Sequence, residues 1–337
     1  MLRTLILLIG APAVGVALGL VALVVLVLPN MQLGDVQRII ELGRHLQQDS
    51  GSPRLVFLGD SVLRDGIDAD LVRDAAPRGW TAENLGLSGC GLNERGILLP
   101  RLLATEPAAV AIGLSVNDLC DGGAVGADKG YAYAYAGFVD PWLADARLGD
   151  FPGLTTETWV ALGSSRLSQW FHFRTVPANW VDYRLRLATR SDLRSGHETD
   201  WIHPYTRTGS IRGARLDRHL AQTRRGLLDC GDRDWGDARN LTNRLAGQIV
   251  GANARLVVVL VPMHPALQDD AVSVLERLKV ASEEIATRHA GILVDATMLL
   301  DAEEFSDALH PNAEGRARFS AQVGRALPLP HPGTEGS

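Results

Sequence analysis

Short apolar runs alternate with candidate helices along most of this chain, and this alternation restricts the fold more than any other feature. The apolar runs are residues 54–58, 81–85, 108–112, 255–261 and 291–294, and the candidate helices between them are 68–76, 93–104, 237–252 and 269–288. Continuous apolar runs bounded by turn residues are typical of parallel strands that are buried on both faces. The sequence therefore predicts an α/β fold with a five-stranded parallel sheet and helices on both of its faces.

One connection is far longer than a single crossover requires. Residues 121–250 separate the third and fourth expected strands, so we expect a cap or insertion there. This segment contains all five tyrosines and six of the seven tryptophans: Trp142, Trp159, Trp170, Trp180, Trp201 and Trp235. Clustered aromatic side chains usually form the core of a small subdomain, and the alternative is a wall that stacks on a sugar or contacts an acyl group.

The N-terminus predicts a membrane anchor over residues 1–30. No charged side chain occurs between Leu5 and Leu28, and this helix of 24 residues would be about 36 Å long. A hydrocarbon core is about 30 Å thick, whereas the apolar part of a cleaved signal peptide has only about 7–15 residues. We therefore favour a retained transmembrane helix over a cleaved signal. Arg3 precedes the span, which by the positive-inside rule places the remainder of the chain outside the cytoplasm.

Two shorter segments flank the expected domain. Residues 31–53 are interpreted as an amphipathic linker with a short helix over 34–48, and residues 328–337 as a flexible tail rich in Pro and Gly.

Charge and cysteine spacing exclude several classes of partner. The net charge is −6 and no block of Lys or Arg occurs, so nucleic acid is not an expected ligand. The three cysteines show neither CxxC nor Cys/His metal spacing. The chain also lacks a Gly-rich phosphate loop with a lysine, so we expect neither a metal nor a nucleotide cofactor.

Polar residues that suit acyl transfer follow four of the five expected strands. Ser61 follows the first, Gly86 the second, Asn117 the third, and Asp307 with His310 the fifth. Ligands of open parallel sheets bind at the carboxyl ends of the strands, so these loops should meet. A serine hydroxyl needs a base, an imidazole can serve as that base, and a carboxylate can orient the imidazole. Backbone and amide N–H groups can then stabilise an oxyanion.

The order of these motifs resembles the SGNH hydrolases, also called GDSL-type esterases and lipases. The motifs are Gly-Asp-Ser at 59–61, Asn-Leu-Gly-Leu-Ser-Gly at 84–89, Val-Asn-Asp at 116–118 and Asp-Ala-Leu-His-Pro-Asn at 307–312. The resemblance covers roughly residues 54–120 and 255–325 and leaves the cap unmatched. It implies a three-layer α/β/α sandwich of flavodoxin-like type over residues 54–327.

The resemblance also implies a role for each motif residue. Ser61 would be the nucleophile, His310 the base and Asp307 its orienting partner. The oxyanion hole would consist of the N–H groups of Ser61 and Gly86 and the amide of Asn117.

Two positions depart from the family pattern. Val62 occupies the place of the leucine that names the GDSL group, and Ser115 occupies a position that is usually glycine. The second change predicts a different backbone in the loop that carries Asn117.

Convergence of the loops carries two further hypotheses. If Gly86 and Asn117 contact one oxyanion, their loops lie close together, and a Cys90–Cys120 disulfide could brace them. His264 follows the fourth strand and reaches the same edge of the sheet, where it would contact substrate or remain a solvated loop histidine.

The expected reaction is acyl transfer through an acyl-serine. With water as acceptor the protein would be an esterase, and with a sugar hydroxyl an O-acyltransferase. A tethered domain with a large cap resembles relatives that modify exported polysaccharide. We therefore expect a single-pass protein of the bacterial inner membrane with a periplasmic domain that acts on acylated, for example acetylated, envelope glycan. The resemblance implies a multispanning membrane acyltransferase as partner. The alternative is an inactive member that binds glycan or scaffolds a membrane complex.

Overall fold

The structure is a computed structural model of the 337-residue chain. It describes residues 14–15, 18–19, 34–46, 54–76, 80–120, 125–145, 154–164, 211–231 and 233–327. The helices before the fourth strand are α2 (Gly34–His45), α3 (Ser61–Gly66), α4 (Ala69–Ala75), α5 (Leu92–Leu103), α6 (Val116–Cys120), α7 (Ala127–Ala136), α8 (Val139–Asp145), α9 (Thr156–Leu162), α12 (Ala214–Gly231) and α13 (Gly236–Gly251). After it come α14 (Pro265–Arg288), a 3-10 turn η6 (Ala302–Glu304) and α15 (Ala313–Ala326).

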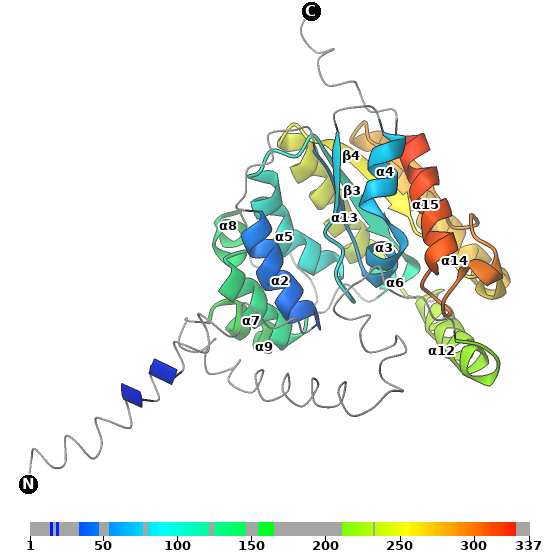
Figure 1. Ribbon diagram of the computed structural model, residues 1–337, viewed down its shortest axis with the longest axis horizontal. Helices are drawn as coiled ribbons and strands as arrows, with labels where there is room; N and C mark the ends of the chain where they lie inside the picture. Colours follow the sequence, from blue (N-terminus) through cyan, green and yellow to red (C-terminus); the bar gives the residue numbers. More distant parts are fainter. Residues whose placement is uncertain are drawn as a thin grey trace, which may run out of the picture.

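The sheet has five parallel strands, which confirms the fold predicted from the apolar runs. The strands are β1 (Arg54–Leu58), β2 (Thr81–Asn84), β3 (Ala109–Leu114), β4 (Arg255–Leu260) and β5 (Ile292–Asp295). Their order in the sheet is β2-β1-β3-β4-β5, and every neighbouring pair is parallel. All carboxyl ends therefore lie at one edge, where α3 and α6 begin directly after β1 and β3 (Figure 1).

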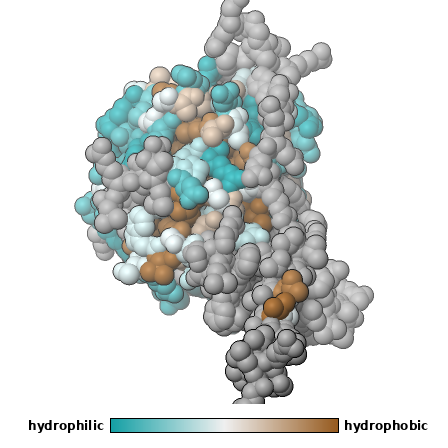
Figure 2. Space-filling view, turned by 90° about the vertical axis from the view of Figure 1, so that its left-hand side faces the viewer, coloured by the Kyte–Doolittle hydropathy of each residue, from teal (hydrophilic) through white to brown (hydrophobic). Residues whose placement is uncertain are grey.

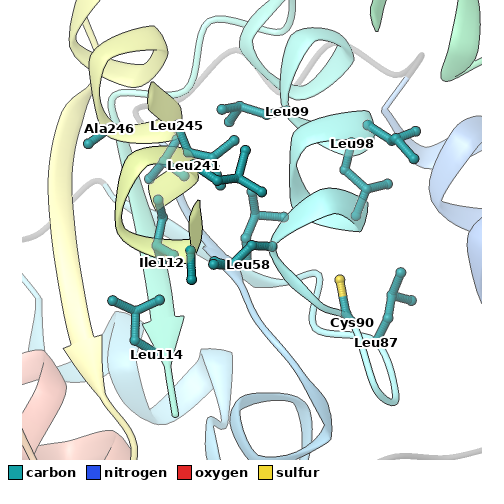
Figure 3. Close-up of a cluster of buried hydrophobic side chains, with 14 of the residues drawn as sticks. Leu58, Leu87, Cys90, Leu98, Leu99, Ile112, Leu114, Leu241, Leu245 and Ala246 are labelled. Carbon is teal, nitrogen blue, oxygen red and sulfur yellow. The ribbon is translucent and has the colours of Figure 1, made fainter. Parts of the chain in front are cut away.

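Successive residues of each strand enter two different cores. Leu55 and Phe57 of β1 belong to the core under α4 and α15, whereas Val56 and Leu58 belong to the core under α5 and α13. Because side chains alternate along a strand, this burial on both sides explains why the four residues after Arg54 are all apolar. Figure 3 shows part of the second core, where α5 and α13 meet Leu58 and Ile112.

The expected linker is in part an element of the folded domain. Helix α2 confirms the amphipathic helix, and its Ile39 is fully buried in the larger core. It packs against α7, and a Cβ at Gly43 would lie 2.8 Å from the Cβ of Ala136. Arg38 of the same helix donates to the carbonyls of Asn84 and Gly86 at 3.1 and 2.9 Å. Helix α2 therefore holds the loop that follows β2. On this side of the molecule the described surface mixes polar and apolar residues (Figure 2).

The long segment between β3 and β4 contributes α7, α8, α9, α12 and α13. The last of these packs against α5 and β4, so it is a layer of the sandwich and the insertion is shorter than the range 121–250. Trp142 is buried and stacks on Trp159 with ring centroids 5.3 Å apart, and Tyr133 packs edge-on against Phe138 at 6.1 Å. These aromatic side chains therefore form the core of the insertion and not a wall that binds a ligand. Trp170, Trp180 and Trp201 lie outside the described residues.

The predicted anchor lies almost entirely outside the described residues. Only residues 14–15 and 18–19 of it are described, and they are helical. Among the described parts of the chain, no helix is long and apolar enough to cross a bilayer. The predicted tail, residues 328–337, also lies outside the described range.

Candidate active site

Ser61 is the first residue of α3, three residues after the end of β1. The preceding residue, Asp60, caps this helix because its Oδ1 accepts the N–H groups of Val62 and Leu63 at 2.9 and 3.3 Å. A capping carboxylate fixes the first turn of a helix and therefore the position of the Ser61 hydroxyl. The Ser61 side chain is partly exposed at this edge of the sheet.

His310 and Asp307 approach Ser61 from the turn between η6 and α15. The Oγ of Ser61 lies 2.9 Å from Nε2 of His310, although the two residues are 249 positions apart in the sequence. On the other side of the ring, Nδ1 lies 3.0 and 2.9 Å from Oδ1 and Oδ2 of Asp307. The three residues therefore form one continuous hydrogen-bonded chain, with the geometry required of a nucleophile, a base and an orienting carboxylate.

The Asp307 carboxylate is held in its ionised form. Burial favours its neutral form, but hydrogen bonds from His310 and from the N–H groups of Leu309 and His310 outweigh this effect, and the pKa of Asp307 lies well below its ordinary value. An ionised partner at Nδ1 keeps the ring proton on Nδ1 and leaves Nε2 free to accept the Ser61 proton. The turn is closed by Ser306, whose N–H and hydroxyl both donate to the carbonyl of His310 at 2.8 and 3.0 Å.

Asn117 lies in the first turn of α6 with its side chain exposed. It lines the same pocket as Val62 and Leu309, which are direct chain neighbours of Ser61 and His310. The structure thus brings Asn117 to the site, where its amide can donate to an oxyanion next to the Ser61 N–H.

Gly86 does not fit the role expected of it. Its N–H donates to the Asn84 side chain at 3.0 Å, and the residue is buried. A Cβ at this position would lie 2.8 Å from Cα of Arg64, so the glycine is required for close packing of the loop against α3. Asn84 was missed by sequence reasoning. Its Nδ2 lies 2.8–3.1 Å from three carbonyls at the end of α3, those of Leu63, Arg64 and Ile67.

The other glycine of this loop, Gly89, has the properties that Gly86 lacks. It is exposed and has φ +53°, a left-handed conformation that glycine adopts without strain. Its carbonyl accepts from Lys129 at 3.3 Å. The sequence signal that distinguishes the two glycines is Asn84. An Asn side chain commonly accepts the N–H of the residue two positions later in a turn, and here that residue is Gly86.

Ser115 accounts for the departure in the third motif. Its hydroxyl lies 3.2 Å from Oδ2 of Asp60 and 3.0 Å from Oδ2 of Asp118, which also accepts the Ser115 N–H at 2.8 Å. The hydroxyl therefore connects the loop that carries Asn117 to the residue that caps the helix of Ser61.

The same network continues into a buried ion pair. Arg95 donates to Oδ1 of Asp118 at 2.6 Å and to the carbonyls of Gly113 and Cys90 at 2.6 and 2.9 Å. Burial raises the pKa of Asp118, Arg95 lowers it, and the nearby Asp60 adds to the increase.

The disulfide hypothesis is wrong in its pairing. Cys120 forms a disulfide with Cys230 of α12, with a Cα–Cα distance of 5.3 Å, whereas Cys90 is a buried free thiol. Cys90 points into the core next to Leu87 and Leu98 (Figure 3), and burial raises the pKa of its thiol. Cys120 ends α6 on the side that faces α12. The disulfide therefore joins the Asn117 helix to the insertion and not to the loop after β2.

His264 is buried, in contrast to the solvated alternative. Its Nδ1 accepts the N–H of Ala266 at 3.1 Å and so caps α14, and its ring packs on Phe305 with centroids 5.0 Å apart. Burial lowers the pKa of His264, while the nearby Asp307 and Glu303 oppose this effect. The ring lines the pocket beside Asn117. No group of three or more His, Cys, Asp or Glu side chains that could hold a metal ion occurs in the described parts of the chain.

Comparison with known proteins gives no match to a family model and none to a curated protein. Several solved structures are similar in fold. A variant of Axe2, an acetyl-xylooligosaccharide esterase from Geobacillus stearothermophilus, is 12% identical over 83% of this chain and 96% of its own, with a TM-score of 0.41. TesA is 13% identical over 82% and 98% of the two chains, with a TM-score of 0.39. A lipase/acylhydrolase from Enterococcus faecalis is 12% identical over 81% and 94%, with a TM-score of 0.37. The functional assignment therefore rests on the site of this chain.

Proposed function

We propose that this protein is a serine-dependent acyl-ester hydrolase of SGNH type. The observation that carries the proposal is the chain of hydrogen-bonding distances from Ser61 Oγ to His310 Nε2 and from His310 Nδ1 to Asp307. Three side chains from two distant segments meet in the order that general-base activation of a hydroxyl requires. A histidine that only forms an ion pair with a carboxylate has no requirement for a serine hydroxyl at its other ring nitrogen, whereas His310 has one there.

The reaction follows from these positions. His310 Nε2 takes the proton of Ser61 as Oγ bonds to the acyl carbon, and the carbonyl oxygen becomes an oxyanion. His310 then returns this proton to the leaving alcohol, and the C–O bond of the ester breaks to give the acyl-serine. A water molecule repeats the sequence, with His310 again as base, and releases the acid and the free Ser61 hydroxyl.

The oxyanion would receive N–H groups from both sides. The Ser61 N–H and the Asn117 amide are the first two donors. Because the Gly86 N–H is directed at Asn84, we propose the Gly89 N–H as the donor from the loop after β2. Removal of one donor of this kind typically lowers the rate about 100- to 1000-fold.

Location, acceptor and partners are further parts of the proposal; the sequence supports them, and the disulfide adds support for the location. We propose that residues 1–30 anchor the protein in the bacterial inner membrane, with the domain on the periplasmic side. The substrate would be an acylated envelope glycan, and a sugar hydroxyl in place of water would make the protein an O-acyltransferase that acts beside a multispanning membrane protein. The disulfide between Cys120 and Cys230 agrees with an oxidising compartment.

Covalent trapping tests the proposal. The full chain is treated with a fluorophosphonate, and its intact mass and the labelled peptide are measured. We expect one adduct, on Ser61, and none in the Ser61→Ala variant. Ser273→Ala, which alters an exposed serine of α14, is the matched control and should label normally. If p-nitrophenyl ester hydrolysis is the same in the Ser61→Ala variant as in the parent, or absent from both, the binding or scaffold alternative replaces the enzyme.

A competition assay then distinguishes the two acceptors. An ester donor is supplied with and without an oligosaccharide, and released acid is measured against acylated sugar. If the amount of released acid is the same with and without the oligosaccharide and no acylated sugar forms, the protein is a hydrolase. If released acid falls and acylated sugar appears, the protein is a transferase.

A further inference from the structure

A narrow apolar pocket opens beside the triad. Its volume is about 40 Å³, which is room for about three water-sized groups. Asn117, Val62 and Leu309 lie at its active-site end. Leu227, Leu267 and Leu278, which are 3%, 1% and 1% exposed, also line it. The methyl group of an acetyl ester would fill only part of this space.

The far wall of the pocket belongs to the insertion. Thr223 and Leu227 of α12 line it, and Cys230 lies on the same face because these positions are four and three residues apart. The Cys120–Cys230 disulfide is thus one helical turn from Leu227 on α12 and one turn from Asn117 on α6. It attaches the wall of the pocket to the helix that carries the amide donor.

Polar contacts on the outer side also hold α12 in place. Arg224 donates to Asp270 at 2.6 Å and to the carbonyl of Ala266 at 3.0 Å, and Arg277 donates to the carbonyl of Gly231 at 2.7 Å. These groups belong to α12 and α14, the two helices that enclose the pocket. This wall of the pocket is therefore preformed, and a preformed wall can discriminate between chain lengths.

The placement of the pocket assigns it to the acyl side of the ester. The leaving alcohol must lie next to Nε2 of His310, which protonates it, whereas the oxyanion must lie next to Asn117. Asn117 lines the pocket, and Ser61 and His310 do not. An acyl chain attached to Ser61 would therefore enter the pocket while the alcohol remains on the other side of His310. His264, which lines the pocket, is already bonded through Nδ1 to the α14 backbone and is neutral, so it adds no charge to this space.

We infer that this pocket binds the acyl chain of the substrate, that it selects short unbranched chains of about four carbons over acetyl, and that Leu227 sets the upper limit. This inference rests on the proposed function and deepens it by naming the acyl class. Each methylene that enters an apolar pocket favours the transition state about fourfold, so a butanoyl ester should exceed an acetyl ester about 16-fold in kcat/KM.

The test is a chain-length series on the full-length protein. The substrates are p-nitrophenyl acetate, butanoate, hexanoate, octanoate and dodecanoate. We expect kcat/KM to rise from acetate to butanoate and to fall for the longer chains. A second series keeps acetyl and varies the alcohol from ethyl to hexyl, and we expect a flat response. A preference for acetate over butanoate, or a preference that follows the alcohol and not the acyl chain, would overturn the inference.

Three variants test the role of Leu227. Leu227→Trp should lower the ratio of kcat/KM for butanoate to that for acetate at least about tenfold. Leu227→Ala should raise kcat/KM for octanoate. Leu228→Trp is the matched control, because Leu228 is the next residue of α12 and is 55% exposed. Equal effects of Leu227→Trp and Leu228→Trp would contradict the assigned wall, and the Ala variant decides the matter if the Trp variant does not fold.

Failure of this inference can be distinguished from failure of the proposed function. Fluorophosphonate labelling of Ser61 with an inverted chain-length profile would reject only the acyl pocket. Absence of both labelling and ester hydrolysis would reject the enzyme itself.

Discussion

Replacement of Asp307 by asparagine provides a sharp test of the triad, because the hydrogen bonds of this carboxylate determine how an amide must lie. Oδ1 of Asp307 accepts the N–H groups of Leu309 and His310 at 2.8 and 2.9 Å. In the Asp307→Asn variant, the amide oxygen must take this position because an NH₂ group cannot accept. The NH₂ group is then placed at the former Oδ2, 2.9 Å from Nδ1 of His310.

The consequence is the wrong tautomer of the histidine. The amide oxygen also lies 3.0 Å from Nδ1, but it is neutral and already accepts two backbone N–H groups. The NH₂ group, in contrast, donates to Nδ1 and favours the tautomer whose single ring proton is on Nε2. This nitrogen faces Ser61 and can then no longer accept its proton. In another Ser-His-Asp enzyme, the same replacement lowers kcat about 10⁴-fold, which corresponds to about 5.5 kcal/mol of activation free energy. We expect a loss of this size in kcat for p-nitrophenyl butanoate, with KM little changed and fluorophosphonate labelling slowed in parallel.

Asp301→Asn is the matched control for this experiment. Asp301 is an exposed aspartate near the same turn, and it pairs with Arg318 at 3.0 Å. Its replacement should leave kcat unchanged. If a folded Asp307→Asn protein retains more than about a tenth of the parent kcat, the tautomer argument is refuted and His310 is not the base.

The remaining predictions concern the oxyanion, the buried ion pair, the disulfide and pH. Asn117→Ala should lower kcat about 100- to 1000-fold with little change in KM, measured by steady-state kinetics. Arg95→Met leaves Asp118 buried without its cation, and the free energy of unfolding in urea should fall by about 3–5 kcal/mol. Reduction of the Cys120–Cys230 disulfide, which closes a loop of 110 residues, should lower the same quantity by about 2–5 kcal/mol. The lowered pKa of Asp307 stabilises the fold fully above about pH 4 and less as pH falls toward the folded-state pKa, so Asp307→Asn should flatten the acid limb of a stability-against-pH curve.

The sheet could be predicted from the sequence because its signal is local. A parallel strand that is buried on both faces has a nearly continuous apolar run, and β3 shows this pattern at every position and β1 and β4 after their first residue, an arginine. The site residues after the strands could be predicted for the same reason, since chain order in a parallel sheet determines which loops share an edge. The structure brings Ser61, Asp307 and His310 together at this edge.

The errors concern contacts that depend on side-chain direction. Cys90 and Cys120 follow two loops of the same edge, but Cys90 turns into the core while Cys120 faces α12, which belongs to the insertion that the motifs leave unmatched. Gly86 was selected as a donor because glycine leaves its N–H accessible. The Asn84 side chain takes that N–H, and a side-chain acceptor two residues away is not visible in a motif. The burial of α2 was missed because an amphipathic pattern does not identify the surface that covers its apolar face.

The network around Ser115 shows how a site made from loops can be held rigid. The nucleophile and the amide donor lie on two short helices, α3 and α6, which follow different strands, β1 and β3. The Ser115 hydroxyl connects the two helices, because it contacts Asp60, which caps α3, and Asp118, which lies in α6. Arg95 extends this connection to the carbonyl of Gly113 in β3, and the disulfide extends it to α12. A glycine at position 115 would keep the N–H that donates to Asp118 but would lose the hydroxyl that lies within hydrogen-bonding distance of both carboxylates. Ser115, which replaces the usual glycine of the third motif, therefore links the two acidic residues through its hydroxyl. In this way it connects the position of the oxyanion donor to that of the nucleophile.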